Sequence, residues 1–233
     1  GLSADYAPLE FHATINGADT IVGADISMSK QIAKDMGVKL QIKEMNFTAL
    51  IGALKTGKID LIVSGMSKTP EREKEVNFST PYLYETQVMV IRKADKAKYK
   101  SIADFSGKRV GAQKQTTQEQ LAKTQLPGAK VTSLDKANDV VAQISYNKLD
   151  AGVLASTIAD SYVARTPSLT VIDPHFATDK APTAIAVSKQ SPALLKQVNK
   201  TISKVKGAKY KSYLQAAYKL QDQDQGFWAK YGN

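Results

Sequence analysis

Cysteine is absent from this 233-residue chain, and histidine occurs only at His12 and His175. Without thiols the chain can form no disulfide framework, no thiolate metal site and no cysteine nucleophile. Two histidines so far apart in the sequence do not indicate a metal centre either. We therefore expect no metal and no cofactor, and we expect both histidines at the surface or behind a site.

Long apolar runs are also missing. None approaches the roughly 18 residues that a membrane-spanning helix requires, and the first residues, GLSADYAPLEF, lack the basic and then apolar layout of a signal peptide. Any signal or lipid anchor is thus expected upstream of Gly1, and the chain as given is expected to be soluble. Its 42% apolar residues are enough for two lobes of roughly 100 residues each to form cores without disulfides.

Arginine is scarce, since it supplies only four of the 32 basic residues in a chain of net charge +10. The lysines are scattered from Lys30 to Lys230 and form no single stripe along the sequence. Such scattering is typical of a solvated surface, so we expect no nucleic-acid partner. An anionic envelope or membrane surface is the alternative partner for this charge.

Short apolar strands alternate with helical segments, which is the pattern of parallel sheets flanked by helices. Capping and turn residues bound the segments of the first third. We predict a hairpin over 9–14 and 20–23, a helix capped by Asp25 and ending at Met36, a strand over 38–45, a helix over 48–56 and a strand over 59–64. The last strand ends beside Ser64, Gly65 and Ser67, and loops at this end of parallel strands bind ligands.

The middle of the chain repeats this order as a second α/β unit over 105–175. Helices are predicted over 116–125, 135–147 and 156–165, and strands over 108–112, 129–133, 149–154 and 169–173. Two apolar segments without turn residues, Gln87–Arg92 and Ala184–Ser188, are predicted to cross between the units. Further helices are expected from Ser191, over 210–220 and over 225–230.

These segments predict an α/β fold of two lobes, each a mainly parallel sheet flanked by helices, joined by a two-strand hinge. Lobe one is predicted over 1–89 and 186–233, and lobe two, inserted, over 90–185. A single continuous sheet is the alternative.

Residues 64–72, SGMSKTPER, and 76–82, VNFSTPY, resemble the signature of the polar amino-acid solute-binding proteins of ABC importers, solute-binding family 3. Further matches lie at 5–8, 22–26, 107–111 and 116–119, so the resemblance covers nearly the whole chain in order. It implies the type II periplasmic-binding fold, which closes about a hinge on its ligand. It also implies an extracytoplasmic protein, either a cell-surface lipoprotein or periplasmic, that delivers its ligand to a membrane permease and catalyses nothing. We expect a monomer.

Other functions use the same fold, including sensory receptors, adhesins and dehydratase-type enzymes. An enzyme would need an acid or a base at the site. The positions discussed below, Ser3 and Ala155, lack one, which argues against an enzyme. A receptor or adhesin stays an alternative, because ligand-induced closure serves all of these functions.

An amino acid is a zwitterion, so a buried site must neutralise both a carboxylate and an ammonium. Arg72 can bind the carboxylate with its planar fork from the first turn of a helix opened by Thr69-Pro70, and the resemblance gives the matching arginine this role. The alternative is a surface arginine among glutamates. On lobe two, Thr117 at a helix start offers a hydroxyl and an N–H to the same carboxylate, with Gln113 and Gln118 as nearby amides.

The remaining candidate ligand-binding residues lie on lobe one. Tyr6 and Phe47 resemble the aromatic walls that enclose a ligand side chain in this family, with core packing as the alternative. Met66 is either a ligand contact or a core residue. Polar partners and a close backbone approach are expected from Ser64, Gly65 and Ser67.

Two positions depart from the family pattern. The carboxylate that holds the ligand's ammonium is replaced by Ala155, and an acid common near the tyrosine segment is replaced by Ser3. Three explanations follow. The ammonium is held by carbonyls, hydroxyls, Glu10 or another carboxylate. Alternatively, the ligand is an amine-free or peptide-like solute, or binding is weakened. Without a cluster of acids, a cationic side chain is disfavoured. We expect an uncharged polar amino acid such as glutamine, asparagine or cystine.

Overall fold

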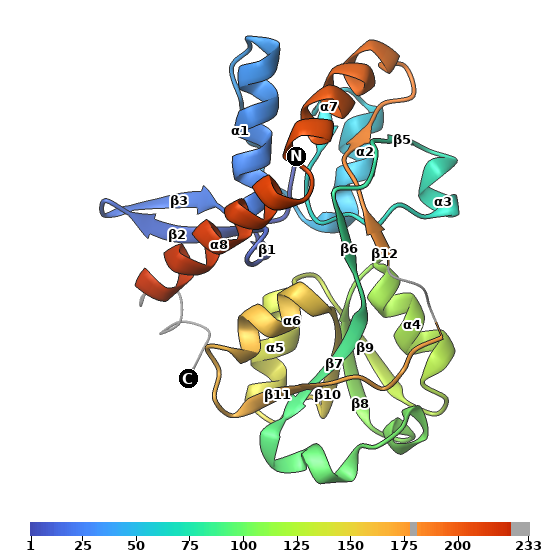
Figure 1. The fold of residues 1–233 in the computed structure, drawn as a ribbon. Coiled ribbons are helices and arrows are strands. Elements are labelled where there is room, and N and C mark those ends of the chain that lie inside the picture. Colours follow the sequence, from blue (N-terminus) through green and yellow to red (C-terminus); the bar gives the residue numbers. More distant parts are fainter. Residues whose placement is uncertain (178–180, 225–233) are drawn as a thin grey trace. The chain divides into compact units, whose positions relative to one another are not determined.

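The computed structural model describes residues 1–177 and 181–224, and the helix predicted over 225–230 lies outside the described residues. Within this part the chain forms two units of mixed α/β structure (Figure 1). Unit 1 comprises Gly1–Tyr84 and the residues from Ala181 to Asp224, and unit 2 begins at Glu85. The chain therefore leaves unit 1, builds unit 2 and returns. The lobe boundaries given above stay predictions of where a hinge would lie.

Strands β6 (Leu83–Glu85) and β12 (Ala181–Thr183) lie where the chain passes between the units, and they pair as a two-stranded sheet. The segments predicted to cross begin a few residues later. β7 (Gln87–Arg92) belongs to the sheet of unit 2, and β13 (Ala186–Val187) belongs to a sheet of unit 1. The two predicted segments are thus sheet strands inside the units that they enter.

A three-stranded antiparallel sheet opens unit 1. It contains β1 (Asp5–Tyr6), β2 (Glu10–Ile15) and β3 (Ala18–Val22), in that order. Asn16 and Gly17 have left-handed φ angles of 52° and 79°, which suit a two-residue hairpin turn. The predicted hairpin is confirmed, with a tighter turn than predicted.

Helix α1 (Ala24–Met36) ends at Gly37 in the left-handed conformation, as predicted. Its beginning differs from the prediction, because Asp25 does not cap it. Gly23 precedes the helix without a side-chain cap, and Asp25 lies fully buried in the first turn. The carboxylate of Asp25 instead accepts hydrogen bonds in the interior of unit 1, which the next subsection describes.

Two carboxyl-terminal helices, α7 (Pro192–Val205) and α8 (Ala208–Gln223), pack against α1. Proline at the first position of α7 follows Ser191, as predicted, since its fixed φ fits a first turn. Apolar side chains of the three helices share one core cluster with Val63, Tyr82 and Ile185. This core includes Tyr82 and Tyr210, which lie next to the loop that follows β4.

The rest of unit 1 contains less sheet than the sequence predicts. Strand β4 (Leu61–Ile62) is the only part of the predicted strand over 59–64 that forms in the described structure, and its sheet is antiparallel, in the order β4-β13-β5. The other elements here are β5 (Asn77–Phe78), a 3₁₀ turn (Phe47–Ala49), α2 (Leu50–Lys55) and α3 (Pro70–Glu73).

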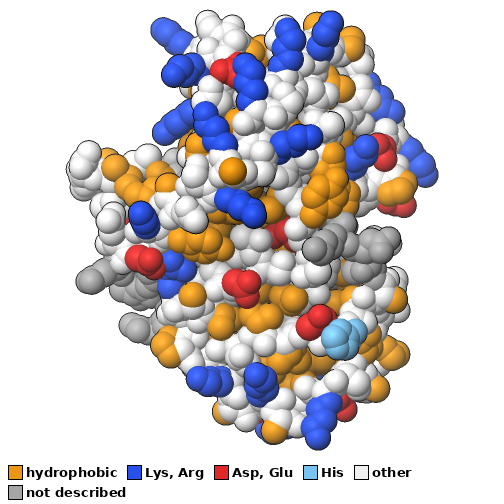
Figure 2. All heavy atoms as spheres, viewed as in Figure 1, with side chains coloured by type: hydrophobic (Ala, Val, Ile, Leu, Met, Phe, Trp, Pro, Cys, Tyr) orange, Lys and Arg blue, Asp and Glu red, His pale blue; other side chains and the backbone are white. Residues whose placement is uncertain are grey.

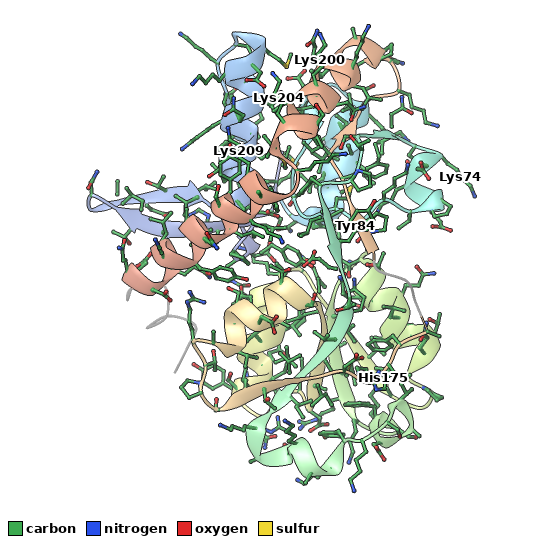
Figure 3. The ribbon with its side chains drawn as sticks, in the orientation of Figure 1. Lys74, Tyr84, His175, Lys200, Lys204 and Lys209 are labelled. Atoms are coloured by element: carbon green, nitrogen blue, oxygen red, sulfur yellow. The ribbon has the colours of Figure 1, made fainter. Side chains whose placement is uncertain are left out.

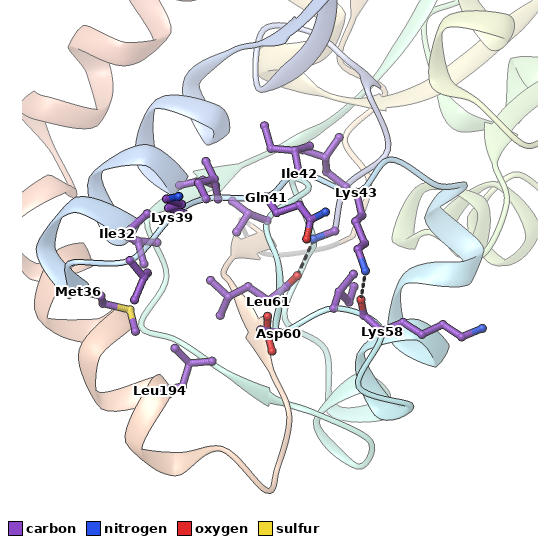
Figure 4. A pocket seen from close by; sticks show the side chains of 18 residues that line it. Ile32, Met36, Lys39, Gln41, Ile42, Lys43, Lys58, Asp60, Leu61 and Leu194 are labelled. Carbon is purple, nitrogen blue, oxygen red and sulfur yellow. Dashed lines mark hydrogen bonds between the residues drawn. The ribbon is translucent and has the colours of Figure 1, made fainter.

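The strand predicted over 38–45 does not form. Within the described chain its strand-like pairing is limited to a parallel bridge between Glu44 and Leu2. The segment and β4 both line a cavity of about 490 Å³, together with Ile32 and Met36 of α1 (Figure 4). They do not pair with each other because Gly1 and Leu2 lie between them: Gly1 bonds to Leu61 and Val63, and Leu2 bonds to Lys43 and Met45. None of the predicted ligand-binding residues lines this cavity.

Unit 2 is built on a five-stranded mixed sheet in the order β11-β7-β10-β8-β9. β8 (Arg109–Gln113) runs parallel to both β9 (Lys130–Leu134) and β10 (Ala151–Ala155). β7 runs antiparallel to β10 and to β11 (Leu169–Ile172). The predicted parallel strands of this unit are confirmed, and β7 is the antiparallel addition.

Three helices pack on this sheet, namely α4 (Thr117–Gln125), α5 (Ala137–Ser145) and α6 (Ser156–Val163). Each begins and ends within two residues of its predicted position. Short 3₁₀ segments, Lys93–Lys98 and Ile102–Phe105, lead from β7 to β8. Within the residues that the structure describes, no helix combines the length and apolar character needed to cross a bilayer.

Candidate functional site

The loop after β4 carries four of the predicted site residues, and buried groups of unit 1 hold it from behind. The Ser64 hydroxyl donates to Glu10 Oε1 at 2.9 Å and accepts the Ser3 N–H at 3.0 Å. The Gly65 N–H donates to Asp25 Oδ2 at 3.1 Å. These hydrogen bonds fix the backbone of the loop. The Ser64 hydroxyl is therefore used within unit 1, between Glu10 and Ser3.

Gly65 is required by the geometry of this loop. Its φ angle of 54° is left-handed, and a Cβ there would lie 2.8 Å from the ring of Tyr6. Any side chain would therefore be strained and would collide with the tyrosine. The close approach places Tyr6, which is half-buried, directly against the predicted binding loop.

Arg72 is held half-buried against Phe47. Its guanidinium carbon lies 5.3 Å from the centre of the Phe47 ring, and its Nη1 donates to the Ser67 carbonyl at 2.7 Å. Burial lowers the pKa of Arg72 to about 10, while the nearby Tyr6 and Glu71 oppose this shift. The guanidinium therefore stays cationic at neutral pH, and its contacts restrict the plane of the fork.

The one-turn helix α3 positions this arginine. Thr69 precedes it in an extended conformation, Pro70 occupies its first turn, and the Thr69 hydroxyl accepts the Arg72 N–H at 3.3 Å. The predicted helix start at Thr69-Pro70 is confirmed. Because the cap occupies the backbone N–H of Arg72, the guanidinium is the group that can bind an anion here.

Met66 and Ser67 take different roles in the loop. The side chain of Met66 is 1% exposed and packs with Leu50 and Ile62, so the core role that was the alternative is the one the structure shows. Any ligand contact of Met66 would use its backbone. Ser67 is also buried, and its backbone forms a bridge to Thr183 in addition to accepting from Arg72.

Two fully buried carboxyl groups lie behind the loop, and the sequence did not predict their association. Asp25 accepts hydrogen bonds from the Tyr210 hydroxyl at 2.6 Å, the Tyr82 hydroxyl at 2.8 Å and the Gly65 N–H. Burial raises the pKa of Asp25, and these three donors oppose the rise. Asp25 is thus the acceptor that joins α1, the predicted binding loop and α8.

Glu10 is the second buried carboxyl group, and it interacts electrostatically with Asp25. Burial and then the charge of Asp25 raise the pKa of Glu10 well above its usual value. One Glu10 oxygen accepts from Ser64, and no ordinary donor reaches the other within the described residues. A proton on that oxygen can be donated to Asp25. The surroundings of Glu10 therefore favour its neutral form.

Glu10→Gln is expected to flatten the decline of stability with rising pH. Since the folded pKa of Glu10 is raised, the stability from its neutral form is complete below about pH 4.5 and is lost as pH rises through the folded pKa. Glutamine keeps a donor and an acceptor but does not titrate. Urea unfolding between pH 5 and pH 8 measures the difference, which should grow with pH by up to ~1.4 kcal/mol per unit.

An exposed carboxylate provides the control for this comparison. Glu73→Gln makes the same substitution on the surface of unit 1, where the carboxylate pairs with Lys68 at 3.0 Å, and should leave the pH profile parallel to that of the wild type. If Glu10→Gln also gave a parallel profile, the raised pKa of Glu10 would be excluded.

On unit 2 the predicted site residues gather around the start of α4. Thr116 is the N-cap, because its hydroxyl accepts the Glu119 N–H at 3.2 Å. Glu119 accepts the Gln115 N–H at 2.7 Å instead of returning to Thr116, so the capping box is not reciprocal. The cap leaves Thr117, which is half-buried, as the first helical residue, in agreement with the prediction that its neighbour caps the helix.

The predicted amides of Gln113 and Gln118 are buried and form hydrogen bonds within unit 2. Gln113 Nε2 donates to the Asp135 carbonyl at 3.1 Å. Gln118 Nε2 donates to Gln87 Oε1 at 2.7 Å, and its own oxygen accepts from Thr117 at 3.3 Å. These contacts orient Thr117 and add Gln87, which sequence reasoning missed, to the group.

Ala155 ends β10 at the same edge of the sheet. It lies opposite Gln87 in the β7–β10 ladder and is 2% exposed. The next helix begins at once, and the N–H of its Thr157 donates to Glu85 Oε1 at 3.2 Å. A buried carboxylate that the sequence did not indicate therefore reaches the end of β10. No local pattern could reveal it, because Glu85 and Thr157 are 72 residues apart in the sequence.

The structure thus brings the predicted residues together as two groups, one in each unit. Comparison with known proteins shows which family the chain resembles. The model of the bacterial extracellular solute-binding proteins, family 3, matches residues 1–219. The chain belongs to this family. Members of family 3 are solute-binding proteins and not enzymes, in agreement with the resemblance seen in the sequence.

Several family 3 proteins show the likeness in detail. The arginine-binding extracellular protein ArtP of Bacillus subtilis (strain 168) is 35% identical over 208 residues, which cover 88% of this chain and 79% of the relative. A substrate-binding protein of a Streptococcus pneumoniae amino-acid ABC transporter, AbpA, was solved with L-arginine bound; its TM-score is 0.91 at 35% identity, with 94% and 93% of the two chains covered.

A third family 3 neighbour bears on ligand choice. It is an ancestral arginine-binding protein solved with glutamine bound, which gives a TM-score of 0.82 at 33% identity and covers 97% of this chain and 96% of its own. The two-lobed α/β fold predicted from the sequence is therefore confirmed. All three proteins are described as binding amino acids, and AbpA is described as part of an ABC transporter.

Proposed function

We propose that this family 3 protein binds an amino acid with an uncharged polar side chain and delivers it to the membrane permease of an ABC importer. The observation that carries the proposal is Arg72, a cation that stays charged although it is partly buried, and that Phe47 and Ser67 hold in one orientation. A fixed, desolvated guanidinium is suited to a carboxylate, which it can bind with two parallel hydrogen bonds.

Closure of the two lobes is proposed to join both groups of residues to one ligand. Arg72 and the N–H and hydroxyl of Thr117 then bind the same carboxylate, while Tyr6 and Phe47 enclose the side chain. A ligand that makes contacts only in the closed form shifts the population toward it. The permease can recognise that closed form, outside the cytoplasm, with the protein acting as a monomer.

The two candidate classes of ligand differ in the charge of the amino-acid side chain, which is either cationic or uncharged. Names of several relatives favour arginine. The residues of this chain favour an uncharged side chain such as that of glutamine, asparagine or cystine. Burial raises the pKa of Glu10, Asp25 is committed to three donors, and Glu85 accepts the Thr157 N–H. Ala155 and Ser3 stand where acids would be needed. A cationic side chain enclosed without an acid would leave its charge unpaired, which is costly.

Thermal unfolding of ligand-stripped protein is the test. A ligand that binds only the native state raises the midpoint, by an amount that grows with its concentration relative to Kd. The proposal expects the largest rise with glutamine, asparagine or cystine. A larger rise with arginine would keep the amino-acid function and overturn the ligand class, and a rise only with amine-blocked compounds or organic acids would replace the amino acid by another anion.

A further inference from the structure

The fold gathers lysines that the sequence scatters. The segments 24–36 and 192–211, which contain α1, α7 and the start of α8, hold eight lysines and two aspartates. They therefore carry +6 of the net charge of +10, whereas the rest of unit 1 has nine basic and ten acidic residues. We name the eight side chains the lysine face: Lys30, Lys34, Lys196, Lys200, Lys204, Lys206, Lys209 and Lys211.

All eight lysines are exposed, and the helices α1, α7 and α8 pack against one another. Figure 3 shows Lys200 and Lys204 on α7 and Lys209 at the start of α8. Lys196, Lys200 and Lys204 repeat every four residues and so lie along one side of α7. The opposite side of α7 packs Val198 and Ile202 into the core. The sequence-based view of a scattered charge is therefore wrong for this part of unit 1, because helices distant in sequence pack side by side.

Contacts with α1 show that the lysines of α7 and α8 converge. Lys204 Nζ lies 3.7 Å from Asp35 Oδ2, and Lys209 Nζ lies 3.4 Å from Gln31 Oε1. Both lysines act electrostatically on Asp35, whose pKa is lowered first by its hydrogen bonds from Thr201 and Gln31. Asp35 is the exposed acid of these segments, since the other, Asp25, is buried. The positive charge is thus largely uncompensated, and Figure 2 shows lysines crowding this end of unit 1.

The chemistry of the face favours an extended anionic surface over a single ligand. These segments contain no arginine, so they lack the forks that bind one phosphate or base in a fixed geometry. Lysines on helix surfaces, mobile and spaced along several turns, suit many phosphates spread over an area. Nucleic-acid recognition would call for interleaved aromatic or arginine side chains.

We propose that the lysine face holds this protein against the anionic phospholipid headgroups of a membrane. Such attachment would keep a solute-binding protein next to a membrane permease without a covalent link. The attraction acts over roughly 8–10 Å at moderate salt and adds up over the lysines, so it is reversible and sensitive to ionic strength. It is independent of amino-acid binding, which uses other residues.

Cosedimentation with lipid vesicles tests the proposal. The protein should bind vesicles of phosphatidylcholine with 30% phosphatidylglycerol at 50 mM salt, bind pure phosphatidylcholine weakly, and be released at 500 mM salt. Replacing Lys30, Lys34, Lys196 and Lys200 with glutamine should lower binding by at least about tenfold. These four lysines have no side-chain partner within the described residues, so their loss should not disturb the fold.

A matched variant distinguishes the effect of the lysine face from the effect of the total net charge. Lys96, Lys114, Lys136 and Lys148 of unit 2 are equally exposed, and their replacement by glutamine gives the same net charge. This variant should bind vesicles within about threefold of the wild type. Equal losses in both variants, or no binding of the wild type to anionic vesicles at 50 mM salt, would overturn the proposal. So would binding to soluble polyphosphate without binding to vesicles. Both variants should keep the rise in midpoint given by the amino acid.

Discussion

Replacing Arg72 with alanine is expected to weaken amino-acid binding by roughly 100- to 1,000-fold. The change leaves the ligand carboxylate without the cation that Phe47 and Ser67 orient. It should leave the fold intact, because Arg72 is only half-buried and the cap at Thr69 uses its backbone N–H. Calorimetric titration gives the affinity, and circular dichroism with thermal unfolding checks the fold.

Two companion variants make this result specific. Arg72→Lys keeps the charge but not the planar fork, so it should recover only part of the affinity. Thr117→Ala removes one hydroxyl and keeps the backbone N–H, so it should weaken binding less than Arg72→Ala does. Retained affinity in Arg72→Ala would remove the arginine from the site. A larger loss at Thr117 than at Arg72 would mean that the roles of the two units are wrongly assigned.

Asp25→Ala is expected to be the most destabilising of the substitutions considered, at about 3–5 kcal/mol. It leaves three buried donors, the hydroxyls of Tyr82 and Tyr210 and the N–H of Gly65, without their acceptor. It also removes the charge that helps to raise the pKa of Glu10. The unfolding midpoint should fall by roughly 10 °C in a chain of this size, as measured by differential scanning calorimetry.

Matched variants separate the buried network from a general effect of losing a carboxylate. Asp60→Ala removes an exposed acid of the same unit and should change stability by less than ~0.5 kcal/mol. Tyr82→Phe and Tyr210→Phe each remove one donor and should each cost about 1–2 kcal/mol. A midpoint for Asp25→Ala within 2 °C of that for Asp60→Ala would contradict the account of this network.

The order of helices and strands in unit 2 could be predicted because each segment carries its own local signals. Thr116 before α4 and the apolar run that forms β10 are examples, and these signals hold even though β7 and β10, which pair, are distant in the sequence. Unit 1 was predicted less well because its short strands, such as β4 and β5, carry few local signals. The residues 38–45 have strand-like composition, but the neighbouring β4 does not pair with them.

The residues of the candidate site also differ in how far the sequence could predict them. Gly65 and Arg72 could be identified from one continuous motif, since their roles follow from the loop and the helix cap that surround them. The pair formed by Glu10 and Asp25 could not, because it requires α1, α8 and the binding loop to meet in the core. Asp25 looked like a helix cap for this reason, since in the sequence an acid before an apolar periodic segment has that meaning.

Calorimetric titration of ligand-stripped protein with two molecules that differ only in the carboxylate tests whether Arg72 recognises an amino acid. The first is the amino acid that raises the midpoint most, and the second is the amine formed by removing its carboxylate, which is 4-aminobutanamide for glutamine and agmatine for arginine. If Arg72 binds the carboxylate of an amino acid, the first should bind and the second should bind at least ~100-fold more weakly. Equal affinity for the two would show that the carboxylate is not recognised and would contradict the account.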